Sequence, residues 1–269
     1  MTTTTDADLL DLARTIAVEA GELALRRRAE GVRVAATKSS SVDIVTETDR
    51  EVEAFIRDRL ARARPGDGFF GEESDASVGA SGLTWVVDPI DGTVNFLYGI
   101  PAWAISIAVV EGEPDPATWT AIAGCVVNPV LGEVYAAARG GGAVLNDVPI
   151  SASAADRLEL SLVGTGFSYD AARRVAQAEA VAKLIGRVRD VRRIGSAALD
   201  LCSVAVGRLD AYVERGLNPW DHAAGAIIAT EAGAVVSGGA GAPAGRALLI
   251  ASAPGIALEV EAAIADAGL

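Results

Sequence analysis

The stretch Trp85-Val-Val-Asp-Pro-Ile-Asp-Gly-Thr-Val-Asn95 decides how this chain of 269 residues is organised. Its first three residues form an apolar run, which predicts a buried strand. Pro89 lacks an N–H group, so we expect it to end the ladder of that strand and to hold Asp88 extended. Asp91-Gly92-Thr93 then turns the chain into a short helix, predicted over residues 93–97.

Two carboxylates on this turn, those of Asp88 and Asp91, lie three residues apart and can converge on one point. The Ile90 carbonyl between them has no evident ladder partner and can point the same way. Such oxygen ligands suit a hard cation, Mg²⁺ before Zn²⁺. Gly92 permits close backbone approach, and the N–H groups that open the helix can bind an anion. The motif predicts a metal-bound phosphate ester; the structural alternative is a capped turn with solvated carboxylates.

Composition limits the classes of protein to which the chain can belong. Its length and its 51% of hydrophobic residues suffice for one large domain or two closely packed halves. We expect a cytoplasmic protein with no membrane partner, because no apolar run reaches the roughly 18 residues of a membrane helix and no signal peptide is evident. Cys125 and Cys202 lie in apolar runs, so no disulfide is expected. The net charge of −13 argues against nucleic acid as a main partner.

The order of the predicted elements favours an α/β fold in two halves. Residues 1–150 form an α+β half, with helices over 6–29 and 44–63 and an antiparallel meander over 103–146. Residues 151–269 form an α/β half, because strands and helices alternate there and loops gather at the strand ends.

Three further acids have both a structural and a functional interpretation. Asp49 falls in the first turn of a predicted helix with Thr46 as its cap, and capping alone explains an acid there. Asp221, in Asn218-Pro-Trp-Asp-His-Ala-Ala-Gly225, also falls in a first helical turn. Glu72 follows a short predicted strand. Together with the first motif, these acids favour a metal site over separate capped turns.

The spacing and type of the candidate residues exclude several classes of hydrolase. Haloacid-dehalogenase-type phosphatases need Asp-x-Asp, whereas this chain has Asp-x-x-Asp. The chain has no Cys-x₅-Arg loop and no Walker A lysine after a glycine-rich loop. His222 is the single histidine, so histidine-phosphate and Ser-His-Asp chemistries lack room. We expect His222 to lie beside the site without being a ligand.

The combination of motifs resembles the inositol monophosphatase family, in particular its bacterial inositol-1-phosphatase branch. Four blocks carry the resemblance in chain order: Lys38-Ser-Ser-Ser-Val-Asp-Ile-Val-Thr-Glu-Thr-Asp49, Gly71-Glu-Glu-Ser74, Asp88-Pro-Ile-Asp-Gly-Thr93 and Trp220-Asp-His-Ala-Ala-Gly225. The match covers roughly residues 8–235. It implies the layered αβαβα sandwich of the sugar phosphatases and Mg²⁺-dependent hydrolysis of myo-inositol monophosphate to inositol and phosphate.

The resemblance also implies two or three Mg²⁺ per site. Glu72, Asp88 and the Ile90 carbonyl are the implied ligands of the first ion. Asp88, Asp91 and Asp221 are the implied ligands of the second, and Glu72 also touches a third, more hydrated ion.

Water is the nucleophile that the resemblance implies. Glu72 and Thr93 would orient and deprotonate this water, with Asp49 holding Thr93. The backbone N–H groups of Gly92 and Thr93 would hold the phosphate. No covalent phosphoenzyme is needed in this scheme.

Substrate choice is implied to come from the second half. Family members place four matching residues around the sugar or cyclitol: Gly195, Ser196, Ala197 and Glu214. Thr165 is expected to border the same pocket, and Lys38 matches the family's lysine near the metal site.

The resemblance further implies a homodimer and inhibition by lithium. Two alternatives stay open on the sequence. One is a related phosphatase acting on histidinol phosphate, fructose 1,6-bisphosphate or a 3′-phosphonucleotide. The other is a regulatory protein that keeps the fold and binds a partner, against which the complete set of carboxylates argues.

Overall fold

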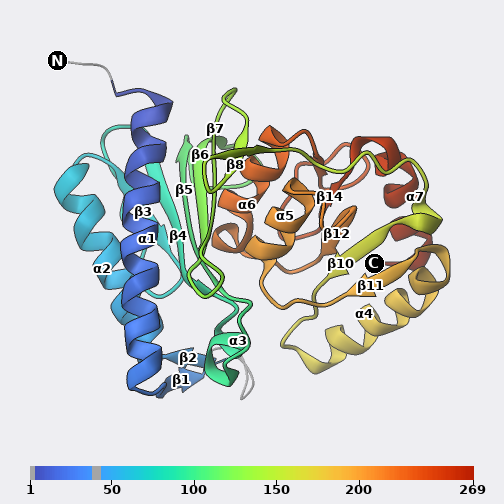
Figure 1. Ribbon diagram of the computed structural model, residues 1–269, viewed down its shortest axis with the longest axis horizontal. Coiled ribbons are helices and arrows are strands. Elements are labelled where there is room, and N and C mark those ends of the chain that lie inside the picture. Colours follow the sequence, from blue (N-terminus) through green and yellow to red (C-terminus); the bar gives the residue numbers. More distant parts are fainter. Residues whose placement is uncertain (1–3, 38–43) are drawn as a thin grey trace.

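Two large sheets with helices on both sides of each make up the fold, as the computed structural model shows (Figure 1). The structure describes residues 4–37 and 44–269. The helices are α1 (Asp6–Glu30), α2 (Glu47–Ala63), α3 (Thr93–Tyr98), α4 (Ala171–Leu184), α5 (Ala197–Ala205), α6 (Pro219–Glu231) and α7 (Ala257–Ala267). The strands are β1 (Val34–Thr37), β2 (Ile44–Thr46), β3 (Gly68–Gly71), β4 (Leu83–Asp91), β5 (Ala104–Glu111), β6 (Thr120–Asn128), β7 (Glu133–Ala138), β8 (Ala143–Leu145), β9 (Val148–Ile150), β10 (Leu162–Thr165), β11 (Asp190–Arg192), β12 (Ala211–Glu214), β13 (Val235–Ser237) and β14 (Leu249–Ser252).

The sheets follow the order of the chain closely. The seven-stranded sheet has the order β3-β4-β5-β6-β7-β8-β9, and only its β3–β4 pair is parallel. The predicted antiparallel meander is therefore present as β5 to β8. The five-stranded sheet has the order β11-β10-β12-β14-β13, with β10 parallel to both of its neighbours.

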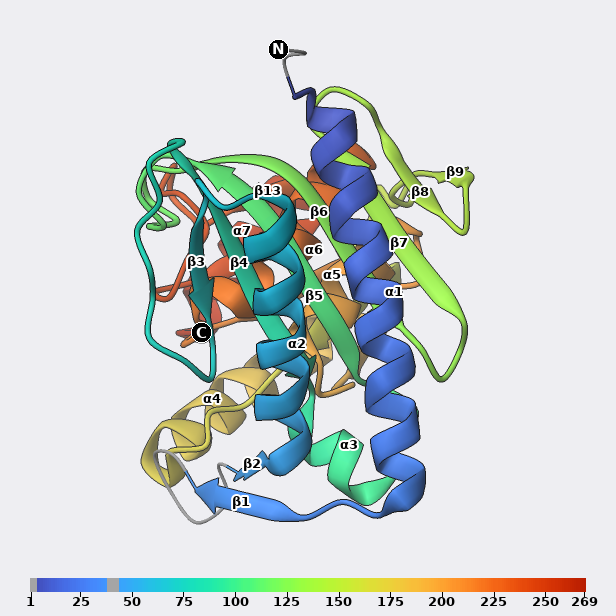
Figure 2. The ribbon, with the colours of Figure 1, turned by 90° about the vertical axis from the view of Figure 1, so that its left-hand side faces the viewer.

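The elements stack in five layers, which confirms the predicted αβαβα fold class. Helices α1 and α2 cover one face of the seven-stranded sheet, and α5 and α6 lie between the two sheets (Figures 1 and 2). Helices α4 and α7 cover the outer face of the five-stranded sheet. Each interface is apolar and includes large buried side chains: Ile16, Ile56, Trp85, Leu201, Tyr212 and Ile264. Burial of each large side chain stabilises the fold by about 1.5–3 kcal/mol.

Capping residues fix the starts of two helices that reach the site. At α2, the Asp49 carboxylate accepts the Thr46 N–H and the Thr46 hydroxyl accepts the Asp49 N–H. Asn218 and Asp221 form the corresponding capping box at α6. A cap of this kind contributes about 1 kcal/mol. It also fixes the direction in which each acid leaves its helix.

Two predicted boundaries are wrong. The helix predicted over residues 44–63 begins at Glu47, because the residues before it form β2, which pairs with β1. Pro89 does not end β4, which continues to Asp91. The pairing of β4 with β5 shifts register between Asp88 and Asp91, and such an irregularity is where a strand accommodates proline.

The seven-stranded sheet ends at Ile150 and the five-stranded sheet begins at Leu162. Helices α5 and α6 pack against strands of both sheets, so the division of the chain into units 1–150 and 151–269 stays a prediction. Across the residues that the structure describes, no helix combines the length and the apolar character that crossing a bilayer requires.

Candidate active site

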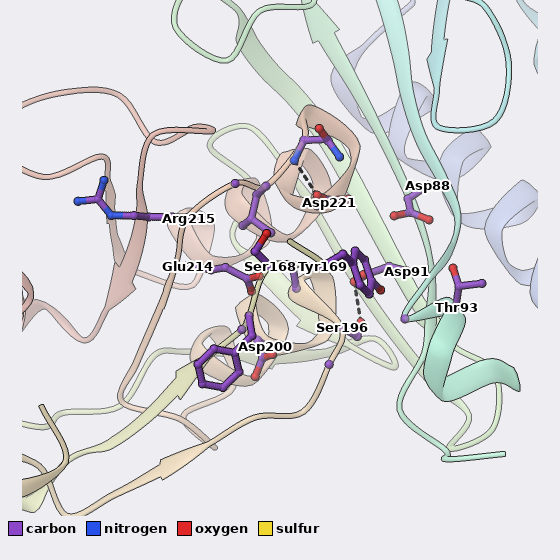
Figure 3. Close-up of a pocket in the computed structure, with 18 of the residues that line it drawn as sticks. Asp88, Asp91, Thr93, Ser168, Tyr169, Ser196, Asp200, Glu214, Arg215 and Asp221 are labelled. Carbon is purple, nitrogen blue, oxygen red and sulfur yellow. Dashed lines mark hydrogen bonds between the residues drawn. The ribbon is translucent and has the colours of Figure 1, made fainter. Parts of the chain in front are cut away.

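A pocket of about 420 Å³ lies between the two sheet-bearing halves, a size typical of small-molecule sites. The first half contributes the carboxyl end of β4 and the start of α3. The second half contributes the loop before α5, the end of β12 and the first turn of α6. Figure 3 shows these side chains pointing into one space from elements far apart in the sequence.

Asp88 and Asp91 lie at the end of β4 and are only 2% and 9% exposed. The Ile90 N–H donates to Asp88 Oδ1 at 3.0 Å. The Ser196 hydroxyl and the Ala198 N–H donate to Asp91 Oδ2 at 2.6 and 2.7 Å. Burial raises the pKa of Asp91 to about 6 against the lowering effect of those hydrogen bonds. Sequence neighbours thus hold Asp88, whereas the second half of the chain holds Asp91.

Two further acids face this pair. Glu72 follows β3, and Asp221 sits in the first turn of α6, where the Asn218 N–H donates to its Oδ2 at 2.6 Å. Burial, and after it the charge of Glu72, raises the pKa of Asp88 and of Asp221 well above its usual range. In the part of the chain that the structure describes, no arginine or lysine forms an ion pair with Asp88, Asp91 or Asp221.

These four acids (Glu72, Asp88, Asp91 and Asp221), hereafter the acid cluster, fit a hard cation by their chemistry. Carboxylate oxygens are ligands that Mg²⁺ prefers, and a cation offsets the mutual repulsion of buried acids. Within residues 4–37 and 44–269, however, no group of three or more such side chains already has the geometry of a formed metal site. One oxygen of Asp91 and one of Asp221 are bound by protein donors, so the other oxygen of each would be the ligand. Metal binding therefore rests on donor chemistry and charge.

Thr93 lies at the start of α3 beside the acid cluster. Its hydroxyl is 3.2 Å from Asp49 Oδ1 and 3.1 Å from the Ile90 carbonyl oxygen, and it can donate its hydrogen to one of them. Asp49 is fully buried, and burial raises its pKa to about 7 against the hydrogen bonds from Thr46. Asp49 therefore caps α2 with one oxygen and faces Thr93 with the other, so its structural interpretation is confirmed and its part in the site stays a prediction.

Gly92 permits a close approach of the two halves. Its φ is +95°, and a Cβ atom there would lie 3.0 Å from the Ala102 carbonyl oxygen and 3.1 Å from that of Gly195. The Asn95 amide donates to the carbonyls of Ala102 and Ile194 at 2.7 and 2.9 Å. A side chain at Gly92 would thus push α3 away from the loop that precedes α5.

Residues predicted to select the substrate lie on the second-half side of the pocket. Gly195, Ser196 and Ala197 line it, and so does Glu214 at the end of β12. The Tyr212 hydroxyl donates to Glu214 Oε2 at 2.5 Å, and burial raises the pKa of Glu214 to about 7.

Two predicted neighbours of the site do not line the pocket, and a third lies outside the described residues. Thr165 does not line the pocket, because its hydroxyl donates to the Val213 carbonyl on the adjacent strand at 2.9 Å. Lys38 lies outside the described residues, so its predicted role stays a prediction. His222 is buried and does not line the pocket, and burial lowers its pKa to about 4.

Sequence reasoning missed other lining residues. Asp200 on α5, Arg193 before it and the loop Gly166–Asp170 all border the pocket. Asp200 carried a usable signal, since it is the one charged residue of Ala197–Ala205. Arg193 and the loop carried no such signal, because only the folded chain brings them to the pocket.

Residues 6–266 match the sequence profile described as the inositol monophosphatase family. The chain belongs to the inositol monophosphatase family. A relative from Mycobacterium leprae named inositol-1-monophosphatase is 46% identical over 94% of this chain and 92% of its own length. The solved structure of Mycobacterium tuberculosis SuhB superposes with a TM-score of 0.83 at 46% identity and covers 98% of each chain. An Escherichia coli relative named Nus factor SuhB is 38% identical over 85% of this chain and 84% of its own length.

These matches confirm the family and the fold that the sequence motifs predict. They extend over both halves of the chain.

Proposed function

We propose that this chain hydrolyses myo-inositol monophosphate to inositol and phosphate with bound Mg²⁺. The acid cluster carries the proposal, because buried acids from β4 and α6 and the half-buried Glu72 meet at a pocket of about 420 Å³, and no described residue forms an ion pair with Asp88, Asp91 or Asp221. Membership of the inositol monophosphatase family supports both the phosphatase reaction and its dependence on metal.

Each member of the acid cluster has a proposed partner ion. Glu72, Asp88 and the Ile90 carbonyl would hold one Mg²⁺, and Asp88, Asp91 and Asp221 a second, with Glu72 near a third. When bound, these ions supply charge to the phosphoryl oxygens and lower the pKa of a water molecule. The chain's own part is to keep the acids buried and oriented, as the Ser196 and Asn218 hydrogen bonds do.

Activation of the water is assigned to Glu72 and Thr93. The Thr93 hydroxyl can pass its hydrogen to Asp49, whose raised pKa of about 7 suits a group that accepts a proton near neutrality. Thr93 would then accept a hydrogen bond from the attacking water, and Glu72 would orient that water. The N–H groups of Gly92 and Thr93 would hold the phosphate.

The leaving group would lie against the second half of the chain. Gly195, Ser196 and Ala197 leave room for a ring, and Glu214 offers carboxyl oxygens to its hydroxyls. Charge-assisted hydrogen bonds of this kind are roughly twice as strong as neutral ones.

Assembly, inhibition and location are finer proposals that rest on the family alone. We propose a cytoplasmic homodimer that lithium inhibits. Sedimentation of the purified chain would give its mass in solution, and a lithium titration of phosphate release would test the inhibition.

A regulatory role is the second candidate, because some relatives are named Nus factor SuhB. The buried acid cluster argues for an enzyme, since acids of this kind are unfavourable unless they bind something. The net charge of −13 also argues against direct binding of nucleic acid by this chain.

Substrate turnover decides between these candidates. Phosphate release with Mg²⁺ should be faster from inositol 1-phosphate than from histidinol phosphate, fructose 1,6-bisphosphate or a 3′-phosphonucleotide. A different preferred ester would move the chain to a related phosphatase. Absence of hydrolysis with every ester would favour the regulatory candidate.

A further inference from the structure

Asp200 is a buried acid that lines the same pocket as Glu214. The function proposed above gives Asp200 no role. Its side chain is 1% exposed and it lines the pocket (Figure 3). Its Oδ1 is fully buried with no hydrogen-bond partner, and no described residue donates to its other oxygen. Buried polar groups almost always have partners, so this carboxyl group needs an explanation.

We propose that Asp200 is a specificity-determining residue, which together with Glu214 binds ring hydroxyls of a polyol phosphate. This inference rests on the proposed function and deepens it by naming a second acid that recognises the leaving group.

Two glycines, one in β10 and one directly after it, leave space for the two acids. A Cβ atom at Gly164 would lie 3.1 Å from Asp200 Oδ1, and one at Gly166 would lie 1.8 Å from Glu214 Oε2. Residues two apart on an extended segment point to the same side, so these glycines leave space for one acid each. The absence of a side chain at Gly164 and at Gly166 therefore makes room for the carboxyl groups of Asp200 and Glu214, respectively.

Two neighbours of the acids are Tyr212 and Arg193. The Tyr212 hydroxyl donates to Glu214, and a Cβ atom at Gly164 would meet both Asp200 Oδ1 at 3.1 Å and Tyr212 Cδ2 at 3.2 Å, so the Tyr212 ring lies near both acids. The charge of Arg193 lowers the pKa of Asp200 and of Glu214 against the larger effect of burial. Glu214 thus has a protein donor, whereas Asp200 lacks one and has capacity for a ligand donor.

The chemistry of the partner follows from this arrangement. Two adjacent carboxyl groups offer acceptors at fixed positions, and a rigid ring with neighbouring hydroxyls offers donors at fixed positions. A nitrophenyl leaving group offers no such donors. Loss of the Asp200 carboxylate should therefore lower kcat/KM for a cyclitol phosphate and leave kcat/KM for a simple aryl phosphate unchanged.

The test compares Asp200→Asn with the wild type on inositol 1-phosphate and on 4-nitrophenyl phosphate. Asparagine keeps the volume and removes the charge. We expect kcat/KM for inositol 1-phosphate to fall about 10–100-fold, mainly through KM, because a charge-assisted hydrogen bond is lost. The value for 4-nitrophenyl phosphate should stay within about twofold of the wild type, since no such bond is made.

Ser203→Ala is the matched control on the same helix. Ser203 lies one turn further along α5, its hydroxyl donates to the Leu199 carbonyl at 2.7 Å, and it does not line the pocket. It should leave the ratio of the two activities unchanged. Asp200→Ala serves as a second variant, because alanine favours the helix.

Deoxy analogues of inositol 1-phosphate identify the hydroxyl concerned. The wild type should lose activity when that hydroxyl is absent, and Asp200→Asn should lose no more with that analogue. Equal losses on both substrates, or a lowered melting temperature with an unchanged activity ratio, would give Asp200 a structural role only and overturn the inference. If the wild type hydrolyses only other esters, the proposed function itself fails and this inference fails with it.

Discussion

Asp88 is the one residue that belongs to the implied ligand sets of both principal ions. Asp88→Asn should lower kcat at saturating Mg²⁺ by at least about 100-fold, since metal charge supplies several kcal/mol of stabilisation. Circular dichroism should show an unchanged fold. Asp58→Asn is the control, because Asp58 forms an exposed pair with Arg62 far from the pocket. A near-normal kcat for Asp88→Asn would remove Asp88 from the ligand set.

Thermal unfolding separates the metal from the reaction at this same residue. Without Mg²⁺, Asp88→Asn should melt above the wild type, because one of several repelling buried acids is gone. Added Mg²⁺ should raise the melting temperature of the wild type far more than that of the variant, since a ligand stabilises the state that binds it. Equal shifts in the two proteins would contradict an ion at Asp88.

Thr93 is assigned to the water and not to the metal, so its variants should behave differently. Thr93→Ala should lower kcat about 10²–10⁴-fold, the usual contribution of positioned proton transfer. The apparent affinity for Mg²⁺ should change little. Thr93→Ser keeps the hydroxyl that faces Asp49 at 3.2 Å and should restore most of the activity. Hydrolysis in ¹⁸O-labelled water without label in the phosphate would refute attack by water on phosphorus.

At the scale of elements, Asp67 joins the end of α2 to the first residues of β4. Its carboxylate accepts from Arg64 Nε and from the Trp85 ring N–H, both at 2.9 Å, and its side chain is only 2% exposed. Asp67→Asn should destabilise the fold by about 2 kcal/mol, because hydrogen bonds to a buried charge are lost. Urea unfolding at neutral pH would measure the change, with the exposed Asp58→Asn as control.

The same acid predicts a dependence of stability on pH. Burial raises the pKa of Asp67, but hydrogen bonds from Arg64, Ser81 and Trp85 bring it below the ordinary value of 3.8. A lowered folded pKa means that the unfolded state binds more protons, so this stabilisation is present above pH 3.8 and is lost as the pH falls through the folded pKa. The wild type and Asp67→Asn should therefore converge in stability in acid. A constant difference down to the lowest pH at which the fold persists would contradict the argument.

Local signals in the sequence predicted most elements and missed those that depend on a partner. The Thr46 cap and the acid at Asp49 mark the start of α2, yet Val45 also fits the apolar spacing of that helix. Only pairing with β1 makes residues 44–46 a strand. Pro89 predicted a strand end, and only the register shift against β5 lets β4 continue.

Local signals also predicted only part of the site. Asp88 and Asp91 are three residues apart, so their convergence follows from the chain itself. Asp221 is 130 residues further on than Asp91, and nothing local predicts that α6 brings it to the same pocket; that step came from the family resemblance. Asp200 was missed although it is the one charged residue of its helix, because no motif drew attention to it.

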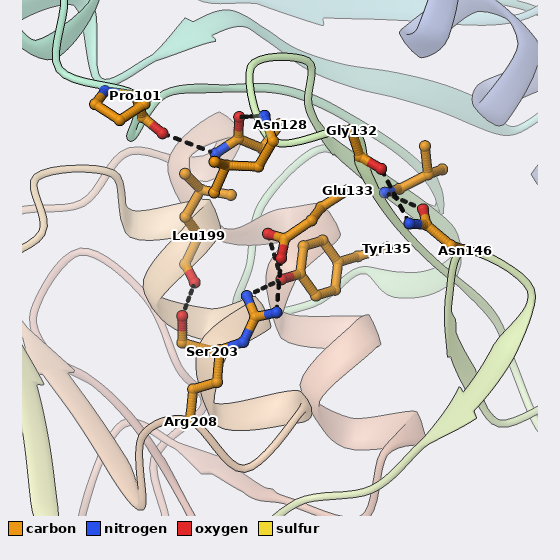
Figure 4. A network of polar contacts seen from close by, with 11 residues as sticks. Pro101, Asn128, Gly132, Glu133, Tyr135, Asn146, Leu199, Ser203 and Arg208 are labelled. Atoms are coloured by element: carbon orange, nitrogen blue, oxygen red, sulfur yellow. Dashed lines mark hydrogen bonds and ion pairs between the residues drawn. The ribbon is translucent and has the colours of Figure 1, made fainter.

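At the scale of the whole molecule, the acid cluster depends on how the two halves are held together. Arg208, in the loop between α5 and β12, donates to Glu133 at 2.6 Å and to the Tyr135 hydroxyl at 2.8 Å, both on β7 of the other sheet (Figure 4). Tyr135 in turn donates to Glu133 at 2.9 Å. The Glu133 side chain is 15% exposed, whereas that of Arg208 is 50% exposed. These contacts clamp the second half to the first on the side of β7.

Arg208→Met should therefore cost stability without touching the chemistry. We expect a loss of about 1 kcal/mol, because the arginine is half exposed and solvent weakens the pair, although Glu133 and Tyr135 then lose a donor. For a chain of this size that loss lowers the melting temperature by roughly 2–4 °C. Arg157→Met is the matched control, since Arg157 pairs with Glu159 within one half and both side chains are more than half exposed.

Measurements of kcat and of the apparent Mg²⁺ affinity show whether the Arg208 contacts only stabilise the fold or also position the site. If the contact only stabilises, kcat and the Mg²⁺ dependence at 25 °C should equal those of the wild type. If it also sets the spacing of the halves, the apparent affinity for Mg²⁺ should fall, because Asp221 comes from α6 whereas Asp88 and Asp91 come from β4. We expect the first outcome, since Ser196 and Ala198 already bind Asp91 across the boundary at 2.6 and 2.7 Å and hold the spacing at the site itself. A lower apparent affinity for Mg²⁺ in Arg208→Met, with Arg157→Met unchanged, would show instead that the distant contact helps to set the site.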